Sequence, residues 1–448
     1  MQWDKLLSDY RLFAPSSPEP SVRSEFRRDC DRIIFSPSFR RLKDKTQVFP
    51  LEKNAFVRTR ITHSLEVSCV GKSLGSSAGQ FLCKKYPKLA QKISFSEIGD
   101  IVEAACLAHD LGNPPFGHDG EEAMRDFFRS TDGQSVLDKL EINSKDRQDL
   151  ENIEGNALGF RICTRLESSD IAGGLRLTAA TIGTTVKYPC FAADNFDAAN
   201  QKKIYKKNGI YQDDKENFQT IFDALEIPEI APNCRLRHPL SFLSEAADDI
   251  CYLIADLEDA YQVGQVSFST ASAILNELAK DFINPEIIKE INSKSDYLAY
   301  LRAKAIGKIV FETLQVFQEK EEELLAGKSK TPLLAEINSA KTLQDLREYS
   351  VKNIYSCRSV LEIQVAGYEI LFGLIKIFCN AIAEISCRGE QASVREQMIF
   401  QLLPERFRRN ADTNYRRILA VCDYISGMTD SYAVSLYKKL TGISLAAN

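Results

Sequence analysis

Apolar residues recur at helical spacing along most of this 448-residue chain. The range 64–86 has apolar positions three and four residues apart, and the range 240–263 alternates apolar and acidic faces. The range 152–189 has the pattern of two helical segments, and charged residues interrupt the apolar range 360–385, which favours a buried helix over a membrane span. Glycine is modest at 22 residues and long stretches lack turn signals, so the pattern predicts an all-α fold.

The segment IVEAACLAHDLGNPPFGHDGEEAM, residues 101–124, concentrates groups that are capable of chemistry. Its first half has a helical apolar pattern, which the range 112–115 (Gly-Asn-Pro-Pro) ends just after His109 and Asp110. Adjacent residues on a helix point about 100° apart, so these two side chains can approach one ion only near the helix end. The segment therefore predicts a metal-binding pair at a helix terminus, with His118 nine residues further on.

Two polar ranges depart from the helical pattern. The range 130–151 is expected to be a mobile excursion on the surface. The range 190–235 reads as a charged insertion with lysine pairs at 202–203 and 206–207, and its role stays open.

Composition limits the partners and the compartment. The net charge is −5, with 57 basic and 62 acidic side chains, which argues against a globally basic nucleic-acid binder but allows a local positive site. The 12 cysteines are scattered without a CxxC pair, as expected for reduced thiols that fill the core of a cytoplasmic protein. The N-terminus carries charges where a signal peptide needs an apolar run, so no targeting segment is expected.

The N-terminal range 1–62 is rich in arginine. It contains Arg23, Arg27, Arg28, Arg32, Arg40, Arg41, Arg58 and Arg60, with Lys43 and Lys45 between them. Two interpretations stay open, a solvated helix face and an anion-binding rim that feeds the site. Arg58 and Arg60 favour the second, because they directly precede His63 and their planar guanidinium groups suit bidentate contacts with phosphate.

Histidine is scarce, and its positions are informative: His63, His109, His118 and His238. Two of these imidazoles combine with two carboxylates into a candidate set of metal ligands: His63, His109, Asp110 and Asp248. A mixed nitrogen and oxygen site suits Mn²⁺, Fe²⁺ or Zn²⁺ and tolerates Mg²⁺. Any single member is more often a satisfied core or surface residue, so the prediction depends on their joint occurrence.

Several longer motifs resemble one family of enzymes. The motifs RTRITHSLEV, AHDLGNPPFGHDGE, EGNALGFR, LTAATIG, VKYP, EAADDICY and DYISGMTD look like those of the deoxyguanosine triphosphate triphosphohydrolase family of HD-domain metal phosphohydrolases. They reach from residue 58 to residue 430, nearly the whole chain. The resemblance implies a helical HD core that binds a divalent metal, with Mn²⁺ or Mg²⁺ favoured. It also implies hydrolysis of a deoxynucleoside triphosphate to deoxynucleoside and tripolyphosphate.

The resemblance implies that His118 and Glu121 act beside the metal, with His118 protonating the departing 5′ oxygen. It favours Asp248 over Asp249 as the metal ligand, because the family's aspartate follows two alanines and precedes by four the aromatic residue that faces the substrate, here Tyr252. Asp249 is expected to be a solvated helix carboxylate. Two interpretations of Tyr252 are about equally favoured: it contacts the base or sugar of the substrate, or it is a tyrosine of the core.

Other candidate residues have weaker signals. Lys187 and Tyr188 close a helical segment, where they could bind phosphate or form a plain surface cap. His238 falls outside the family pattern and is expected to be structural, at the start of a helix.

Three parts are expected: an arginine-rich segment over 1–62, an HD-type catalytic core over 63–264, and a C-terminal helical region over 265–448 for packing and oligomerisation. The expected substrate is dGTP, with broad hydrolysis of deoxynucleoside triphosphates (dNTPs) as the near alternative, and single-stranded DNA or a nucleotide as effector. A homo-oligomer without membrane association is expected. Two other functions stay open, an HD-type nucleotide phosphodiesterase and a nucleic-acid-binding protein with a vestigial site.

Overall fold

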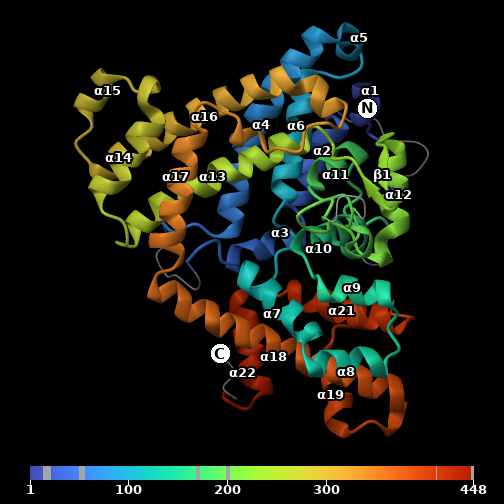
Figure 1. Ribbon diagram of the computed structural model, residues 1–448. Coiled ribbons are helices and arrows are strands. Elements are labelled where there is room, and N and C mark those ends of the chain that lie inside the picture. Colours follow the sequence, from blue (N-terminus) through green and yellow to red (C-terminus); the bar gives the residue numbers. More distant parts are fainter. Residues whose placement is uncertain (14–21, 50–55, 168–171, 198–201, 410, 445–448) are drawn as a thin grey trace.

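The structure is a computed structural model that describes residues 1–13, 22–49, 56–167, 172–197, 202–409 and 411–444. Helices dominate these residues, and their one sheet is a two-stranded antiparallel pair (Figure 1). Its strands are β1 (Glu229–Ala231) and β2 (Cys234–Arg235), with Glu229 opposite Arg235 and Ala231 opposite Cys234. The all-α prediction is confirmed.

One hydrophobic core, core 1, is organised around three helices: α4 (Arg60–Lys85), α6 (Phe95–Ala108) and α13 (Ser241–Gln262). Helices α4 and α6 approach closely, since a Cβ at Gly75 would lie 2.9 Å from the Val102 side chain. The helices packed around them are α1 (Trp3–Leu6), α2 (Glu25–Ile34), α3 (Pro37–Arg41), α5 (Pro87–Ala90), α11 (Ala179–Thr185), α12 (Lys215–Ala224), α14 (Phe268–Ala279), α16 (Lys294–Leu325) and α17 (Ala340–Ser350). The short α15 (Pro285–Glu290) follows α14 at the edge (Figure 1).

A second hydrophobic core, core 2, forms around α7 (Gly117–Arg129) and the long α18 (Arg358–Arg388), which pack against each other. Its other helices are α8 (Thr131–Lys139), α9 (Ser144–Glu151), α10 (Gly155–Arg161), α19 (Val394–Leu402), α20 (Glu405–Arg409), α21 (Asn414–Ser426) and α22 (Asp430–Leu440). The segment 109–116 connects α6 of core 1 to α7 of core 2. That segment contains the predicted metal pair, so the site lies where the two cores meet.

The range 130–151 is not an excursion, and its predicted mobility finds no counterpart in the structure. Ser130 caps α8 by accepting a hydrogen bond from the Gly133 amide, and Asn143 caps α9 in the same manner. Val136, Leu137 and Leu150 are buried in core 2. The range looked polar because short amphipathic helices bury only a few of their residues.

Helix α18 is long and apolar enough to cross a membrane by length and composition, with a mean hydropathy of 1.8 in its most apolar stretch. It packs against α7, α19, α21 and α22, and it buries Leu371, Leu374 and Ile375. These contacts are those of a core helix, as predicted from its charged residues. Near its N-terminal end Leu361 and Val365 are exposed.

Cys190 and Cys234 form a disulfide, and the other ten cysteines are free. The prediction that every cysteine is reduced is therefore wrong for this pair. The two residues face each other across an isolated antiparallel bridge, which places their side chains together. They are 44 residues apart in sequence, without a spacing pattern that indicates pairing.

His238 is buried just before α13. Its Nε2–H donates to the Leu6 carbonyl at 3.0 Å, and its Nδ1 accepts from the Leu240 amide at 3.1 Å. Burial lowers the pKa of the imidazole to about 4, so it stays neutral at physiological pH. These contacts confirm the structural role predicted for His238.

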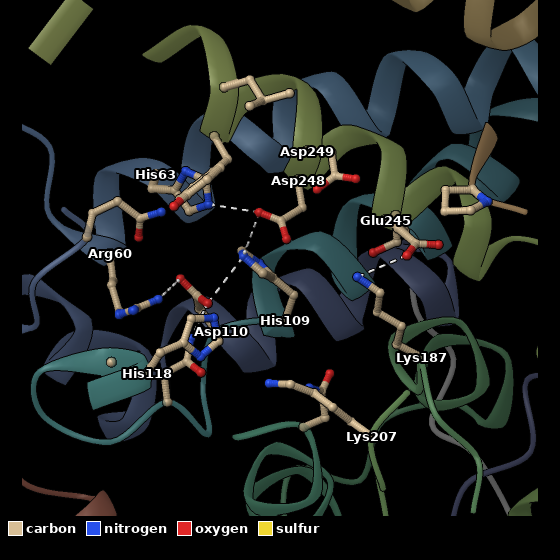
Figure 2. A pocket seen from close by; sticks show the side chains of 18 of the residues that line it. Arg60, His63, His109, Asp110, His118, Lys187, Lys207, Glu245, Asp248 and Asp249 are labelled. Atoms are coloured by element: carbon tan, nitrogen blue, oxygen red, sulfur yellow. Dashed lines mark hydrogen bonds and ion pairs between the residues drawn. The ribbon is translucent and has the colours of Figure 1, made fainter. Parts of the chain in front are cut away.

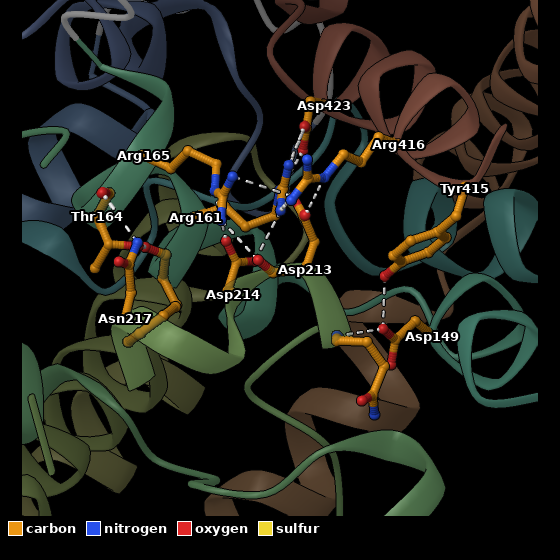
Figure 3. A network of polar contacts seen from close by, with 12 residues as sticks. Asp149, Arg161, Thr164, Arg165, Asp213, Asp214, Asn217, Tyr415, Arg416 and Asp423 are labelled. Carbon is orange, nitrogen blue, oxygen red and sulfur yellow. Dashed lines mark hydrogen bonds and ion pairs between the residues drawn. The ribbon is translucent and has the colours of Figure 1, made fainter. Parts of the chain in front are cut away.

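A buried charge network fastens α10 to α21 (Figure 3). The Arg161 guanidinium donates to Asp423 at 2.8 Å, to Asp214 at 2.8 Å and to Asp213 at 3.0 Å. Arg161 and all three carboxylates are almost completely shielded from solvent. Loss of one partner would leave a buried charge uncompensated, so this network stabilises the contact between α10 and the C-terminal region.

Candidate active site

Helices α4, α6 and α13 bring the four predicted metal ligands together (Figure 2). His63 lies in the first turn of α4, His109 is the residue at which α6 ends, and Asp248 projects from α13. The His63 Nε2 atom lies 3.1 Å from Asp248 Oδ1, and the His109 Nε2 atom lies 3.5 Å from the same oxygen. Asp110 Oδ1 lies 3.4 Å from His109 Nε2. One ligand atom each from His63, His109 and Asp110 lies within 4.8 Å of the others.

The His109 ring is held in an orientation that suits metal binding. Its Nδ1 lies 2.6 Å from the Cys106 carbonyl oxygen, so Nδ1–H donates there and the neutral ring keeps its lone pair on Nε2. That Nε2 is buried and has no hydrogen-bond partner within the described residues. A buried polar atom of this kind is costly unless a ligand satisfies it. Two imidazoles and two carboxylates around such an atom fit a divalent cation.

The charges of this cluster depend on one another. Burial alone would raise the pKa of Asp248, but the His109 and His63 imidazoles lower it well below its usual range. Burial would likewise lower the pKa of His109, but Asp110 and Asp248 raise it. Both shifts favour an ionised Asp248 beside a positively charged His109 ring. A divalent cation would supply that positive charge when it replaces the protons.

The two arginines predicted to bind substrate have different surroundings. Arg60 donates to Asp110 at 2.9 Å and lines the cavity above the cluster. Arg58 is not among the described residues that line this cavity. Three carboxylates surround its guanidinium instead, from Glu66, Glu258 and Asp259, at 2.6, 2.6 and 2.5 Å. Its predicted contact with substrate is not supported, because its donors are already satisfied.

The other N-terminal arginines show the same behaviour. Each of several guanidinium groups faces a carboxylate of its own neighbourhood, as in the pairs Arg23–Asp31, Arg27–Glu103, Arg28–Glu25 and Arg41–Glu167. None of these four arginines is among the described lining residues. Among the described arginines and lysines of the range 1–62, only Arg60 lines the cavity, so the expected anion-binding rim is supported there alone.

His118 and Glu121 lie together on the first turns of α7. The His118 side chain is 81% exposed, and its Nδ1 lies 3.2 Å from Glu121 Oε2. Glu121 is buried, and its other oxygen accepts from the Gly155 amide at 2.9 Å. Burial would raise the pKa of Glu121, but the hydrogen bond from His118 and the nearby Lys207 lower it. Glu121 therefore stays ionised and orients the His118 ring through its contact with Nδ1. Glu121 does not contact the Nε2 atom of that ring.

A cavity of about 760 Å³ opens over the cluster. Lys187, Tyr188 and Tyr252, the other predicted substrate-binding residues, line it together with His118. Lys187 Nζ lies 3.0 Å from Glu245 Oε1. The Tyr252 ring lies 5.7 Å from the Tyr355 ring at an angle of 30°, so the two form an aromatic wall. This position argues against Tyr252 as a plain core residue.

Sequence reasoning missed several charged residues that line the cavity: Lys206, Lys207, Arg347 and Asp249. The pair 206–207 was visible as a lysine pair, but only the folded chain shows that the insertion turns toward the site. Arg347 of α17 lies 3.6 Å from Asp249, so the expectation of a plain solvated carboxylate at Asp249 is wrong. Together with Arg60 and Lys187, these cations supply local positive charge to a cavity that also contains the carboxylates of Asp110, Asp119, Glu154, Glu245, Asp248 and Asp249.

All three expected parts of the chain contribute to the cavity. Thr46, Gln47 and Val48 come from the range 1–62, and Gln344 and Tyr355 come from the range 265–448. The C-terminal region therefore builds part of the site in addition to packing. The exact division of the chain into three parts remains a prediction.

The helical fold and the His-Asp cluster place this chain in the class of HD-domain phosphohydrolases. The HD domain family matches residues 60–166. A phosphohydrolase-associated domain matches residues 336–439. The chain is a hydrolase that belongs to the deoxyguanosinetriphosphate triphosphohydrolase-like family, as its relatives show. It is 40% identical to a deoxyguanosinetriphosphate triphosphohydrolase-like protein of Synechocystis, over 99% of this chain and 100% of the relative.

Two further relatives support the same family. A deoxyguanosinetriphosphate triphosphohydrolase-like protein of Pseudomonas aeruginosa is 39% identical over 99% of each chain. The deoxyguanosinetriphosphate triphosphohydrolase of Yersinia enterocolitica is 31% identical, over 95% of this chain and 96% of the relative. The family inferred from the sequence motifs is therefore confirmed.

Proposed function

We propose that this enzyme hydrolyses dGTP to deoxyguanosine and tripolyphosphate, with other dNTPs as the near alternative substrates. One observation carries the proposal: a single cavity is lined by the His-Asp cluster, by cations suited to a triphosphate, and by the Tyr252–Tyr355 wall suited to a nucleoside. The names of the relatives support dGTP as first choice.

His63, His109, Asp110 and Asp248 would hold the divalent ion, Mn²⁺ or Mg²⁺. When bound, such an ion lowers the pKa of a water ligand and offsets phosphate charge. Lys187, Lys206, Lys207 and Arg347 would bind the phosphate oxygens, each as a charge-assisted donor. Three of these cations now face carboxylates, Lys187 beside Glu245, Lys207 beside Glu154 and Arg347 beside Asp249, which keep them in place before substrate arrives.

His118 would act as the general acid. The oxygen of water joins the α-phosphorus, the bond from that phosphorus to the 5′ oxygen breaks, the His118 proton goes to the 5′ oxygen, and the proton that the water loses passes to solvent. The deoxynucleoside then leaves with its 5′ hydroxyl intact, and tripolyphosphate is the second product. Glu121 would hold the His118 ring for this transfer through the contact at Nδ1.

Product identification tests the reaction. The purified enzyme is incubated with each dNTP and with GTP, in Mn²⁺ or Mg²⁺, with and without single-stranded DNA, and products are separated by anion exchange and identified by phosphorus NMR. We expect deoxynucleoside and tripolyphosphate, with dGTP turned over fastest. Pyrophosphate or orthophosphate as the primary product would contradict the proposal, and turnover of phosphodiesters alone would favour the phosphodiesterase alternative.

Replacing Lys207 with alanine should lower kcat/KM for dGTP by about 10- to 100-fold, because a hydrogen bond to a charged group contributes about 1.5–3 kcal/mol. Lys207 lines the cavity and lies 2.8 Å from Glu154 Oε1. Lys203→Ala is the matched control, since Lys203 is exposed and is not among the described lining residues. Steady-state kinetics on both variants check this, and equal losses would show that Lys207 has no special role.

The remaining expectations extend beyond this cavity. A homo-oligomer is proposed because Leu361 and Val365 leave apolar surface on α18, and a single monomeric species in light scattering would contradict it. A cytoplasmic location and activation by single-stranded DNA or a nucleotide remain predictions.

A further inference from the structure

The motif DYISGMTD, which ends in Asp430, has no role in the proposed reaction. Asp430 is nevertheless buried beside the active-site cavity. Asp430 is the first residue of α22, and only 1% of it is exposed. Its Oδ1 accepts from the Phe116 amide at 3.1 Å, and its Oδ2 accepts from the Thr46 amide at 2.9 Å and from the Thr46 hydroxyl. One carboxylate thus joins the C-terminal helix to two segments that lie more than 300 residues away in sequence.

Lys45 makes a second connection between the same segments. Its ammonium group is buried and donates to the Asn113 carbonyl and to the Ser426 carbonyl, the latter at 2.7 Å. Its own carbonyl accepts from the Arg60 amide at 3.1 Å, at the start of α4. Lys45 therefore ties the start of the helix that carries His63 to the connecting segment 109–116.

These bonds matter because the proposed chemistry is divided between the two cores. The His63, His109 and Asp248 side chains come from helices of core 1, whereas His118 and Glu121 come from α7 of core 2. The relative position of the two groups depends on how the segment 109–116 is held. Asp430 contacts that segment from the C-terminal region, and Lys45 contacts it from the N-terminal range while it also donates to Ser426 of the C-terminal region.

Phe116 is the critical residue of this segment. Its φ of +60° lies in the left-handed region, which is unfavourable for a residue with a side chain, and it directly precedes α7. Its amide is held by Asp430, and its ring packs so closely on α18 that a Cβ at Gly367 would lie 2.5 Å from it. His118 follows two residues later, so the backbone conformation of Phe116 sets where the imidazole points.

We propose that Asp430, assisted by Lys45, is a positioning residue that holds His118 at the correct distance from the metal cluster, so that the C-terminal region completes the active site. The inference rests on the proposed function, because it assigns His118 the proton transfer. Asp430 does not touch substrate in this account. It acts through the Phe116 amide, and its loss should affect the chemical step more than binding.

Kinetics of Asp430 variants in two backgrounds test this proposal. Asp430→Ala should lower kcat for dGTP by about 10- to 100-fold, as expected for a misplaced catalytic group, while KM and Mn²⁺ affinity change less than about threefold. In a His118→Ala background the same substitution should lower kcat by less than about twofold, because the imidazole that Asp430 positions is already absent. Equal losses of kcat in both backgrounds would overturn the proposal.

Controls separate positioning from damage to the fold. Asp412→Ala removes an exposed carboxylate of the same C-terminal region, which pairs only with Arg416 among its described partners, and it should leave kcat unchanged. Asp430→Asn keeps an acceptor for the Phe116 amide but loses the one for the Thr46 amide, so its kcat should lie between wild type and Asp430→Ala. It provides the test if the alanine variant does not fold, and a kcat equal to that of wild type for both variants would overturn the proposal.

Hydrogen exchange gives a readout that does not need activity. Asp430→Ala, which removes the acceptor for the Phe116 amide, should accelerate amide exchange in peptides that cover residues 111–118, with little change in peptides from α4. Unchanged exchange there would overturn the positioning role even in an active enzyme. A wild-type enzyme that releases no tripolyphosphate would instead overturn the proposed function, and the exchange result would still show whether Asp430 holds the segment.

Discussion

Replacing His109 with alanine should abolish metal binding and dNTP hydrolysis together. The variant loses the buried Nε2 that has no hydrogen-bond partner among the described residues, and it leaves the Asp110 and Asp248 carboxylates without the imidazole between them. Loss of the ion removes several kcal/mol of charge stabilisation in the transition state, so kcat/KM should fall by about 10³-fold or more. Steady-state kinetics with dGTP and elemental analysis of the purified protein measure the two losses.

Thermal unfolding gives an independent check of the metal site. A ligand present at 100 times its Kd stabilises the folded state by about 2.7 kcal/mol, so Mn²⁺ should raise the Tm of the wild-type enzyme. The Tm of His109→Ala should not respond to Mn²⁺. Asp249→Asn is a matched control, because Asp249 faces Arg347 and its variant should keep the response. A variant without His109 that retained metal and activity would disprove the assignment.

Much of the metal cluster was predictable because its signals are local. A run of apolar residues ended by glycine and two prolines located the end of α6, and His109 is indeed the residue at which that helix ends. The placement of His63 on α4 and Asp248 on α13 followed from helical periodicity and from the family motifs. Their convergence could not be derived from periodicity alone, since it depends on how three helices cross.

Long-range electrostatics were less predictable. Arg58 and Arg60 are two residues apart and looked equivalent in sequence, but only Arg60 reaches the cavity. Successive positions near a helix start point to different sides, and two of the three carboxylates that bind Arg58, from Glu258 and Asp259, lie 200 and 201 residues away in sequence. Arg347 and Lys207 were missed for the same reason, since their approach to the site depends on tertiary packing of distant segments.

The division into two cores explains why the C-terminal region looked like a packing element. Its apolar helices do form core 2, and that part of the prediction was sound. The polar residues that reach the site from this region are isolated: Gln344, Arg347, Tyr355 and Gln364 line the cavity, and Asp430 lies behind it. Single polar residues carry little signal in one sequence, so their role becomes visible only when the chain is folded.

Replacing His118 with alanine should lower kcat for dGTP by about 10²- to 10⁴-fold while metal binding is retained, because general acid catalysis contributes that factor. Its imidazole is exposed on α7, and no described contact ties it to the His63–Asp248 cluster, so elemental analysis should find wild-type metal content. Glu121→Gln should cause a smaller loss, since the amide can still contact Nδ1 but without the charge that stabilises the protonated ring.

A substrate with a better leaving group separates proton donation from other roles of His118. In a dGTP analogue with sulfur in place of the bridging 5′ oxygen, the departing thiolate has a pKa of about 8.5, as for a free thiol, and needs no proton to leave. His118→Ala should therefore turn over this analogue at a rate within about tenfold of wild type, although it is severely impaired with dGTP. Equal impairment on both substrates would mean that His118 binds or orients the phosphates, and the general acid would then have to be sought among the other groups that line the cavity.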